Sequence, residues 1–264
     1  MTTPQSTAQG PSQGPSQRVA VVTGASSGIG EATARALAAQ GFHVIVVARR
    51  VDRITALAEQ IGGTAVVADV TDPVAVAALV QASDAVSGSI NVLVNNAGGA
   101  RGMESVERAD LDHWRWMWET NVLGTLQVTR ALLPKLIASG DGLIVTVTSI
   151  AAFEIYDGGS GYTSAKHAQS ALHRTLRGEL LGQPVRLTEI APGMVDTEFS
   201  LVRFDGDRQR ADAVYEGLTP LTAADIAEVI GFVASRPPHV DLDQIIIRPR
   251  DQASATRASR RVTR

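Results

Sequence analysis

Cysteine is absent from the 264 residues of this chain. Disulfides, thiolate nucleophiles and cysteine-based zinc sites are therefore excluded. An excess of basic residues is also missing, because the formal net charge at pH 7 is −3. That balance gives no reason to expect nucleic acid or an anionic membrane surface as a partner.

Long apolar runs are missing too. The longest, such as residues 44–48 and 143–147, have the length of a strand and are too short to cross a bilayer. Residues 1–17 contain no large apolar residue except Met1, whereas a signal peptide needs an apolar central region. We therefore expect a cytoplasmic protein that does not enter a membrane.

The two ends of the chain differ in composition from the part between them. Residues 1–17 are rich in Pro, Gly, Ser and Gln and include the near-repeat GPSQGPSQ, which is typical of a disordered tail. Residues 251–264 are basic and rich in small side chains, and we interpret them as a flexible tail, with a binding arm as the alternative. Residues 18–250 remain as one domain with enough apolar residues for a buried sheet.

Within that domain, short β-branched runs alternate with helical segments. The runs predict seven strands, at residues 18–24, 43–49, 64–70, 91–95, 143–149, 185–191 and 244–248. The intervening segments predict helices at residues 31–40, 52–61, from 72 onward, 110–137, 161–181 and 222–235. Such alternation predicts an α/β fold with a single Rossmann-type, doubly wound parallel sheet and helices on both faces. Ligands of such sheets bind at the carboxyl ends of the strands.

A glycine-rich turn joins the first predicted strand to the first predicted helix. Gly24 permits a tight exit from the strand, Gly28 lets the backbone approach a pyrophosphate, and Gly30 lets helix and strand pack closely. The amino end of the helix adds free N–H groups and a partial positive charge. We therefore predict a dinucleotide-binding turn made of Gly24, Ser26, Ser27, Gly28, Ile29 and Gly30.

The end of the second strand indicates which dinucleotide binds. An acidic residue at this place would bind the ribose 2′-hydroxyl of NAD, but the chain has Arg49 and Arg50 there. Two guanidinium groups suit a 2′-phosphate, so we predict NADP(H); a solvated surface pair is the alternative. Asp69, at the end of the third strand, is placed to accept a hydrogen bond from the adenine amino group.

Tyr162 and Lys166 lie four residues apart at the start of a predicted helix, so their side chains share one face. Of the 24 Lys and Arg residues only two are lysines, Lys135 and Lys166. Most basic residues of this chain are arginines, but position 166 has a lysine, whose ammonium is a compact point charge where a guanidinium is broad.

Together these motifs resemble the short-chain dehydrogenase/reductase family over nearly all of residues 18–250. The shared motifs are Thr-Gly-x-x-x-Gly-x-Gly at 23–30, Asn-Asn-Ala-Gly at 95–98, Asn121, Ser149 thirteen residues before Tyr162, Tyr-x-x-x-Lys and Pro192-Gly193. The resemblance implies a catalytic set of Asn121, Ser149, Tyr162 and Lys166. It also implies cofactor contacts from Tyr162, Lys166, Val70, Asn96, Ala97, Gly98, Pro192, Gly193, Val195 and Thr197.

Residues 191–207 and 236–249 are similar to a subgroup of NADP-dependent 3-hydroxy acid dehydrogenases that also oxidise serine and allo-threonine. That resemblance implies a homotetramer and a substrate lid after Pro192-Gly193. Candidate substrate residues are Glu154, Tyr156 and Arg203, the last being a cation that could pair with a carboxylate. Glu154 would repel a substrate anion unless it binds an amino group or faces water, so a general ketone or steroid reductase stays as the alternative.

The resemblance also implies a mechanism without a metal ion. Tyr162 acts as acid in ketone reduction and as base in alcohol oxidation. A free phenol has a pKa of about 10, and lowering it to about 7 requires roughly 4 kcal/mol of preference for the phenolate. Lys166 and the nicotinamide ring supply that field, Ser149 binds the substrate oxygen, and Asn121 holds a water that relays protons to Lys166. A catalytically silent NADP-binding sensor is disfavoured because all four positions are present.

Three tryptophans, Trp114, Trp116 and Trp118, lie on the predicted helix 110–137 before Asn121. Trp114 and Trp118 share a face from which Trp116 points away. Because one face packs on the sheet, the other would present an aromatic group outward, as interfaces favour. We therefore predict a homo-oligomer; in the alternative, a loop of the same chain covers Trp116.

Overall fold

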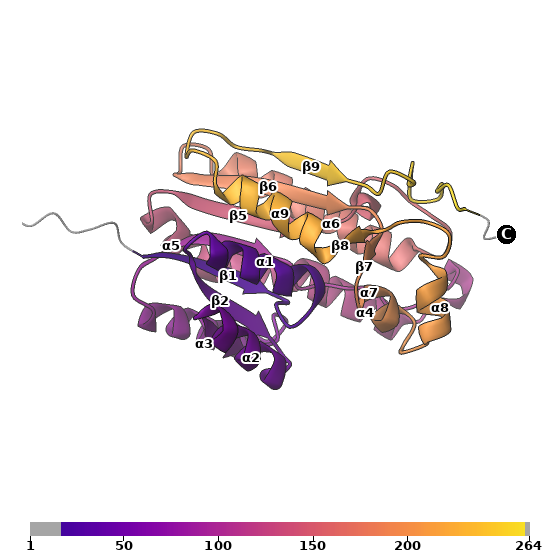
Figure 1. Cartoon of the computed structure of the whole chain (residues 1–264), viewed down its shortest axis with the longest axis horizontal. Helices are drawn as coiled ribbons and strands as arrows, with labels where there is room; N and C mark the ends of the chain where they lie inside the picture. Colours follow the sequence, from indigo (N-terminus) through magenta and orange to yellow (C-terminus); the bar gives the residue numbers. More distant parts are fainter. Residues whose placement is uncertain (1–16, 262–264) are drawn as a thin grey trace, which may run out of the picture.

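The computed structural model describes residues 17–261. Its centre is a sheet of seven parallel strands in the order β3-β2-β1-β4-β5-β6-β9, which confirms the predicted Rossmann-type α/β fold (Figure 1). The strands are Arg18–Thr23 (β1), His43–Ala48 (β2), Thr64–Val67 (β3), Ser89–Asn95 (β4), Gly142–Val147 (β5), Val185–Pro192 (β6) and Gln244–Ile247 (β9). The predicted tail at residues 1–17 lies outside the described residues except for Gln17.

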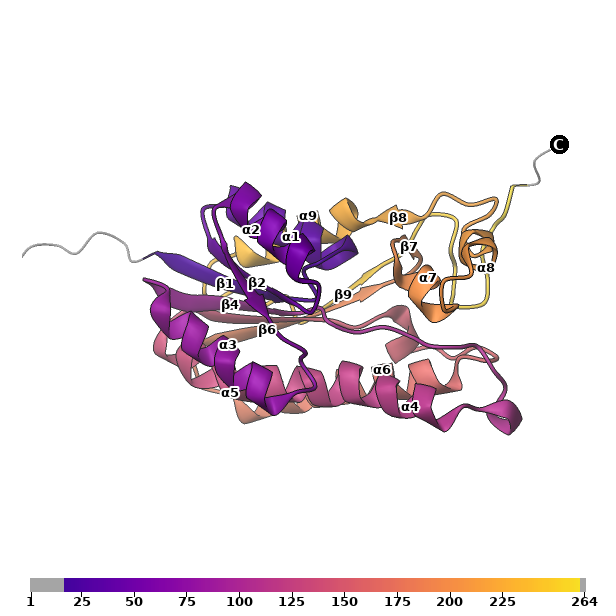
Figure 2. The same cartoon turned by 90° about the horizontal axis from the view of Figure 1, so that it is seen from below.

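Helices cover both faces of this sheet (Figure 2). One face packs against Gly28–Ala39 (α1), Val51–Ile61 (α2) and Ala223–Ala234 (α9), and the other against Pro73–Ala85 (α3), Gly124–Ala138 (α5) and Ser160–Glu179 (α6). The five inner strands are therefore buried on both sides, which explains why they are continuous apolar runs rather than alternating patterns, whereas the edge strands β3 and β9 are more exposed. All residues of β5 are buried, for example.

Side-chain caps fix two of the helix starts that the sequence predicts. Asp72 accepts a hydrogen bond from Val74 N at 2.9 Å, and proline follows it as the first residue of α3. Thr222 and Asp225 form a reciprocal capping box at the start of α9. Both arrangements satisfy amide groups that a helix start leaves without intrahelical partners.

The predicted helix over residues 110–137 is present, but it contains a π-helical turn that the sequence did not indicate. The structure has α4 (Leu111–Trp118), then a π-helical turn (Glu119–Leu123, η2), then α5. Asn121 lies in this turn, and its side-chain amide donates to the backbone oxygens of Met117 at 2.7 Å and of Gly99 at 2.9 Å. The turn thus places a fully buried polar side chain against the loop after β4. Such bulges are frequent at functional sites.

Beyond β6 the chain builds a cap over the carboxyl edge of the sheet. Two short helices, Phe199–Arg203 (α7) and Arg208–Ala213 (α8), lie between the two-residue strands Val195–Asp196 (β7) and Leu221–Thr222 (β8), which pair in parallel. We call residues 197–219 the lid. None of the helices within residues 17–261 has the length and apolar character needed to span a bilayer.

Candidate active site

A cavity of about 620 Å³ opens at the carboxyl ends of the strands, under the lid. It lies where the strand order reverses between β1 and β4, the place at which ligands bind in doubly wound sheets. All the predicted site residues line it except three, Gly30, Asn121 and Glu154.

The glycine-rich turn forms the floor of one end of the cavity. Gly24 has a φ of 66°, and a Cβ there would lie 2.8 Å from Asn96 Nδ2 and 2.9 Å from Ala97 Cα. A Cβ on Gly30 would overlap the carbonyl oxygen of Gly24, so Gly30 serves packing and not the cavity wall. Thr23 Oγ1 accepts hydrogen bonds from the backbone N–H groups of Asn96 and Ala97, both at 3.0 Å. The first and fourth strands are thus fixed to each other beside the turn.

The two arginines after β2 have different surroundings. Arg50 donates from Nε to Ser26 Oγ at 2.9 Å and from Nη2 to Ser27 Oγ at 2.6 Å, so it lies directly on the glycine-rich turn. Arg49 is more exposed and approaches Asp69 at 3.6 Å. Burial raises the pKa of Asp69, but hydrogen bonds from Thr71 and the charge of Arg49 outweigh that effect and leave the pKa below its usual value.

Sequence reasoning missed two further residues at this end. Glu198 accepts hydrogen bonds from Arg50 at 2.7 Å and from Arg53 at 2.8 Å. These two hydrogen bonds lower the pKa of Glu198 to about 2. Glu198 precedes α7 by one residue, so the lid is joined by ion pairs to the start of α2. Contacts across nearly 150 residues leave no local signal in a sequence.

The predicted catalytic side chains meet at the other end of the cavity. Tyr162 and Lys166 lie on the first two turns of α6, and both are buried. Lys166 Nζ lies 5.8 Å from the centre of the Tyr162 ring and donates to Val147 O at 3.2 Å and to Gln169 Oε1 at 2.8 Å. Ser149, just after β5, lines the same wall. Asn121 lies behind the wall, where Gly99 N donates to its Oδ1 at 3.2 Å, and its water-holding role stays a prediction.

Burial dominates the ionisation of this pair. It raises the pKa of Tyr162, as does the nearby Tyr156, while a hydrogen bond with Ser149 and the charge of Arg203 act in the opposite direction. Burial lowers the pKa of Lys166 to about 7, against the opposing charge of Glu189. The protein alone therefore keeps the phenol protonated, which is the form that ketone reduction requires.

The third cluster is a cation at the substrate end. Arg203 donates from Nε to Gly102 O and from Nη1 to Tyr156 Oη, both at 3.0 Å. Its guanidinium lies 5.9 Å from the centre of the Tyr162 ring. Its Nη2 is buried and has no hydrogen-bond partner within the described part of the chain. The structure thus brings together Arg203, Tyr156 and Tyr162, which the sequence predicts as site residues, and Arg203 Nη2 is a donor without an acceptor among the described residues.

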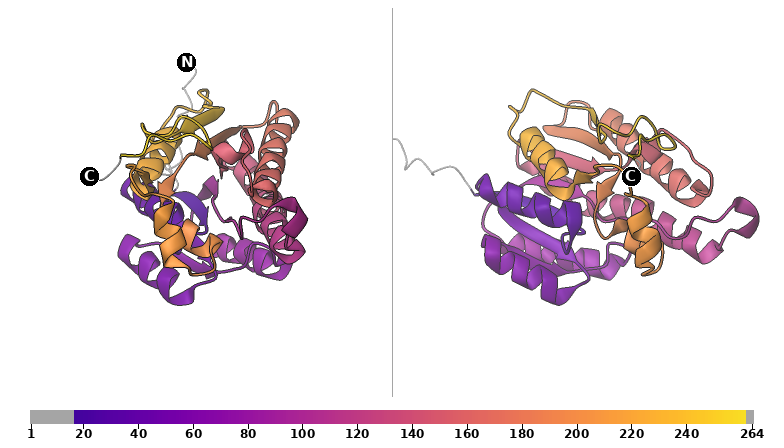
Figure 3. Two further views of the ribbon diagram at one scale, coloured as in Figure 1. Left: turned by 90° about the vertical axis from the view of Figure 1, so that its right-hand side faces the viewer. Right: turned by 45° about the vertical axis from the view of Figure 1, so that its right-hand side comes forward.

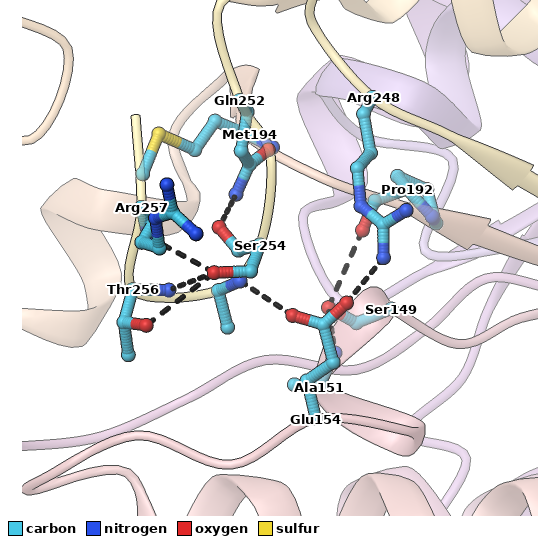
Figure 4. A network of polar contacts seen from close by, with 11 residues as sticks. Ser149, Ala151, Glu154, Pro192, Met194, Arg248, Gln252, Ser254, Thr256 and Arg257 are labelled. Atoms are coloured by element: carbon cyan, nitrogen blue, oxygen red, sulfur yellow. Dashed lines mark hydrogen bonds and ion pairs between the residues drawn. The ribbon is translucent and has the colours of Figure 1, made fainter. Parts of the chain in front are cut away.

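Glu154 does not line the cavity, and its expected contact with a substrate stays a prediction. It forms an ion pair with Arg248 and accepts a hydrogen bond from Ala255 N at 2.5 Å (Figure 4). Because the carboxylate is paired with a guanidinium, it offers no unpaired negative charge to a substrate. It joins the loop after Ser149 to the residues that follow β9.

Residues 251–261, which belong to the tail predicted from composition, make specific contacts with the rest of the structure. Residues 251–261 lie beside the lid helices (Figure 3). Gln252 is buried and accepts a hydrogen bond from Met194 N at 2.8 Å, and Arg260 donates to Glu216 O at 2.5 Å and Val214 O at 3.0 Å. Gln252, Ala255 and Arg260 all line the cavity. Backbone oxygens of the lid accept hydrogen bonds from this segment, and the amino-acid composition of the segment gives no indication of these contacts.

The tryptophans follow the alternative interpretation. Trp116 lines the cavity, where the Arg101 guanidinium stacks at 4.7 Å from its ring centre and a Cβ on Gly99 would contact it. A loop of the same chain thus covers Trp116. Trp118 is the exposed member, with 45% of its surface accessible.

Comparison with known proteins identifies the family. The family model described as short chain dehydrogenase matches residues 18–206. The chain belongs to the short chain dehydrogenase family. It is therefore an oxidoreductase that acts on hydroxyl or carbonyl groups, as its motifs predict.

Three relatives and one solved structure refine this picture. An oxidoreductase of Mycobacterium tuberculosis is 78% identical, over 91% of this chain and 94% of its own. A sulfoacetaldehyde reductase of Chromohalobacter salexigens is 41% identical (88% and 94%), and a serine 3-dehydrogenase of Agrobacterium fabrum is 39% identical (89% and 95%). The closed form of a serine dehydrogenase complexed with NADP+ superposes with a TM-score of 0.86 at 34% identity, covering 92% of this chain and all of the other.

Proposed function

We propose that this enzyme transfers a hydride between NADP(H) and a small hydroxy acid, such as serine, allo-threonine or 3-hydroxybutyrate, or the corresponding carbonyl acid. The observation that carries the proposal is Arg203 Nη2, which lies near the Tyr162 ring and has no hydrogen-bond partner among residues 17–261. A buried guanidinium nitrogen without an acceptor is costly, and a carboxylate or sulfonate of a substrate would satisfy it.

The names of the relatives agree with this chemistry. Serine carries a carboxylate and sulfoacetaldehyde a sulfonate, and in both molecules one carbon separates the anionic group from the carbon that bears the reacting oxygen. An enzyme for such substrates needs a cation a few ångströms from its proton donor. In support, the Arg203 guanidinium lies 5.9 Å from the centre of the Tyr162 ring.

The residues at the opposite end of the cavity fit NADP(H). Side chains at Gly24 and Gly30 would collide with the residues that pack against the turn, so glycine at both positions preserves the tight turn whose backbone N–H groups suit a pyrophosphate. Arg50 lies on the serines of that turn, with Arg53 one helical turn further along α2, and both guanidinium groups suit a 2′-phosphate. The bound cofactor supplies or accepts the hydride.

Side chains of the protein carry out the proton transfer. In the reducing direction, Tyr162 Oη donates a proton to the substrate oxygen, and Ser149 Oγ orients that oxygen by a hydrogen bond. Lys166 stabilises the resulting phenolate with its positive charge. Phe199 and other apolar residues of the lid, together with Met103 from the loop after β4, exclude water, which strengthens these electrostatic interactions.

We also propose that the enzyme is a homotetramer. In support, Leu111, Trp118, Leu123 and Leu126 are exposed along α4, η2 and α5. Apolar side chains gathered on one surface are typical of subunit interfaces. A monomeric mass by light scattering at micromolar concentration would reject the assembly. The cytoplasmic location stays a prediction.

NADP+ reduction assays test the proposed substrate class. We expect turnover of L-serine, L-allo-threonine, 3-hydroxybutyrate or 3-hydroxypropionate, and slower turnover of neutral secondary alcohols of similar size. Tyr162→Phe should lower kcat by about 10²–10⁴-fold while NADPH fluorescence titrations still show binding. A Tyr162→Phe enzyme with more than about a tenth of the normal rate would contradict the proton-donor assignment, and activity on neutral alcohols alone would indicate a general ketone reductase.

A further inference from the structure

Glu189 is a buried acid that the proposed mechanism does not use. It lies in β6, with 1% of its surface accessible, between Thr146 of β5 and Gln244 of β9 in the sheet register. Among residues 17–261 no Lys, Arg or His lies within ion-pair distance of it. A buried carboxylate without a cation is costly unless hydrogen bonds replace its hydration, so its presence calls for a reason.

Three neutral donors replace that hydration. Thr148 Oγ1 donates to Oε1 at 2.8 Å, and Ser170 Oγ and Gln244 Nε2 donate to Oε2 at 3.0 and 3.1 Å. Hydrogen bonds from neutral donors leave the full negative charge in place. Two of the donors lie beside the reacting groups, because Thr148 precedes Ser149 and Ser170 follows Lys166 by four residues on α6. The carboxylate therefore joins the end of β5 to the face of α6 that bears Lys166.

Lys166 has few other charged groups around it. Its own hydrogen bonds go to neutral acceptors, Val147 O and Gln169 Oε1. Tyr162 lies beside it on α6, and beyond that ring lie Tyr156 and the positive charge of Arg203 on α7. Glu189, from β6, is the acidic group that opposes the loss of the Lys166 proton on burial, so it raises the pKa that burial lowers.

The groups on the far side of Glu189 do not cancel its charge. Burial lowers the pKa of His173, against the charges of Glu189, Asp243 and Asp241, so this imidazole on α6 is neutral at pH 7. Arg177, also on α6, is bound to Asp241 at 2.5 Å and to Asp243 at 3.2 Å. The cation nearby is thus engaged with two other carboxylates.

We propose that Glu189 is a positioning residue for the reaction: it fixes β5 against α6 and keeps the Lys166 ammonium protonated while that side chain is buried. This inference rests on the proposed function, because Lys166 acts in it as the partner of the proton donor. A neutral lysine would supply no field to the phenol. The acid thereby offsets part of the decrease in the Lys166 pKa that the exclusion of water causes.

The small number of lysines permits a direct measurement of this effect. In protein labelled with ¹³C at lysine Cε, NMR should show two resonances, and Lys135→Arg assigns them. We expect Glu189→Gln to lower the titration midpoint of Lys166 by about one pH unit or more, as the loss of a close opposite charge does, while Lys135 stays unchanged. Ser170→Ala and Thr148→Val each remove one hydrogen bond to Glu189 but keep the charge, so their Lys166 midpoints should stay near that of the wild type.

Glu189→Gln is isosteric, but an unfavourable contact between two amide groups at positions 189 and 244 could weaken folding. The double variant Glu189→Gln with Gln244→Glu keeps the pair complementary and moves the charge to an exposed position on β9, where solvent screens it. Its Lys166 midpoint should also lie below that of the wild type. A wild-type midpoint in either folded variant overturns the proposal, whatever the enzyme's activity.

The pH profile of kcat/KM for carbonyl reduction gives the second readout. Reduction requires protonated Tyr162 and charged Lys166, and removal of a nearby negative charge makes both groups lose protons at lower pH. The decrease of kcat/KM at high pH should therefore begin at a lower pH in Glu189→Gln than in the wild type. At high pH the kcat/KM of Glu189→Gln should be well below that of the wild type, whereas at low pH the two should be equal. A uniform loss of rate at all pH values would assign Glu189 a structural role alone. Inactivity of the wild type on every hydroxy acid would refute the proposed substrates but leave the NMR result standing.

Discussion

The role of Arg203 can be measured by removing its guanidinium and the substrate's charge separately. Arg203→Met keeps most of the aliphatic stem and removes every donor. In the structure two donors are engaged, with Gly102 O and Tyr156 Oη, and Nη2 is free among the described residues. The substitution therefore has two effects, on the position of the loop around Gly102 and on the bound anion.

A double-mutant cycle separates these effects. The loop effect should reduce kcat/KM equally for 3-hydroxybutyrate and for its uncharged methyl ester. The anion effect should reduce it for the acid alone. One hydrogen bond between charged groups contributes about 1.5–3 kcal/mol, and each 1.4 kcal/mol is a factor of ten, so the acid should lose about 10–150-fold more than the ester.

The assay is the initial rate of NADP+ reduction with both substrates, in the wild type and in Arg203→Met. Arg101→Met is the matched control, because Arg101 stacks on Trp116 near the cavity but does not line it. It should affect acid and ester alike. If Arg203→Met also reduces both rates by the same factor, or if the unmodified enzyme prefers the ester, Arg203 does not recognise a carboxylate and the reasoning fails.

Three further predictions follow from other contacts. Arg50→Ala should weaken NADPH binding by at least about tenfold, as the loss of one charge-assisted hydrogen bond does, and should affect NADH binding less. Arg49 is more exposed, so Arg49→Ala should weaken NADPH binding less than Arg50→Ala does, and equal losses of NADPH affinity in the two variants would contradict the assignment. Deletion of residues 251–264 should raise KM for the hydroxy acid and lower Tm, because it removes the contacts of Gln252 and Arg260, and an unchanged KM and Tm would contradict this role. Because burial lowers the pKa of His173, this residue binds a proton more readily in the unfolded chain than in the folded one. The free energy of unfolding measured with urea should therefore fall as the pH drops below about 6.5, and it should fall less steeply in His173→Gln.

The architecture could be predicted because its signals are local. A strand buried on both faces must be apolar throughout, and a helix needs a cap and a terminating glycine, so the strands and helices can be read from short windows. Gly24, Gly28 and Gly30 follow from the same logic, since positive φ angles and close packing at a turn exclude other residues. Tyr162 and Lys166 could be found because their spacing is helical and lysine is rare in this chain.

The remaining features depend on contacts that no window contains. Glu154 is an isolated acid in the sequence, and its partners Arg248 and Ala255 lie 94 and 101 residues away. The π-helical turn at Asn121 forms because a side-chain amide reaches Gly99 as well as Met117. The segment 251–261 is ordered by backbone oxygens of the lid. In each case a polar group finds its partner only after the sheet has brought distant segments together.

The distribution of satisfied and unsatisfied groups indicates which parts of the site the ligands complete. The ion pairs of Glu198 with Arg50 and Arg53 and of Glu154 with Arg248 are closed within the protein, and they hold the lid and the C-terminal segment in place. The costly features lie inside the cavity: a guanidinium nitrogen without an acceptor, among the described residues, on Arg203, and an ammonium on Lys166 whose hydration burial has removed. Such destabilising features persist where the surrounding fold holds the residues in place, and at functional sites they are part of the mechanism. The fold thus places two basic side chains close to Tyr162, with Lys166 Nζ at 5.8 Å and the Arg203 guanidinium at 5.9 Å from the ring centre, and in the proposed mechanism Arg203 binds a substrate anion while Lys166 stabilises the phenolate.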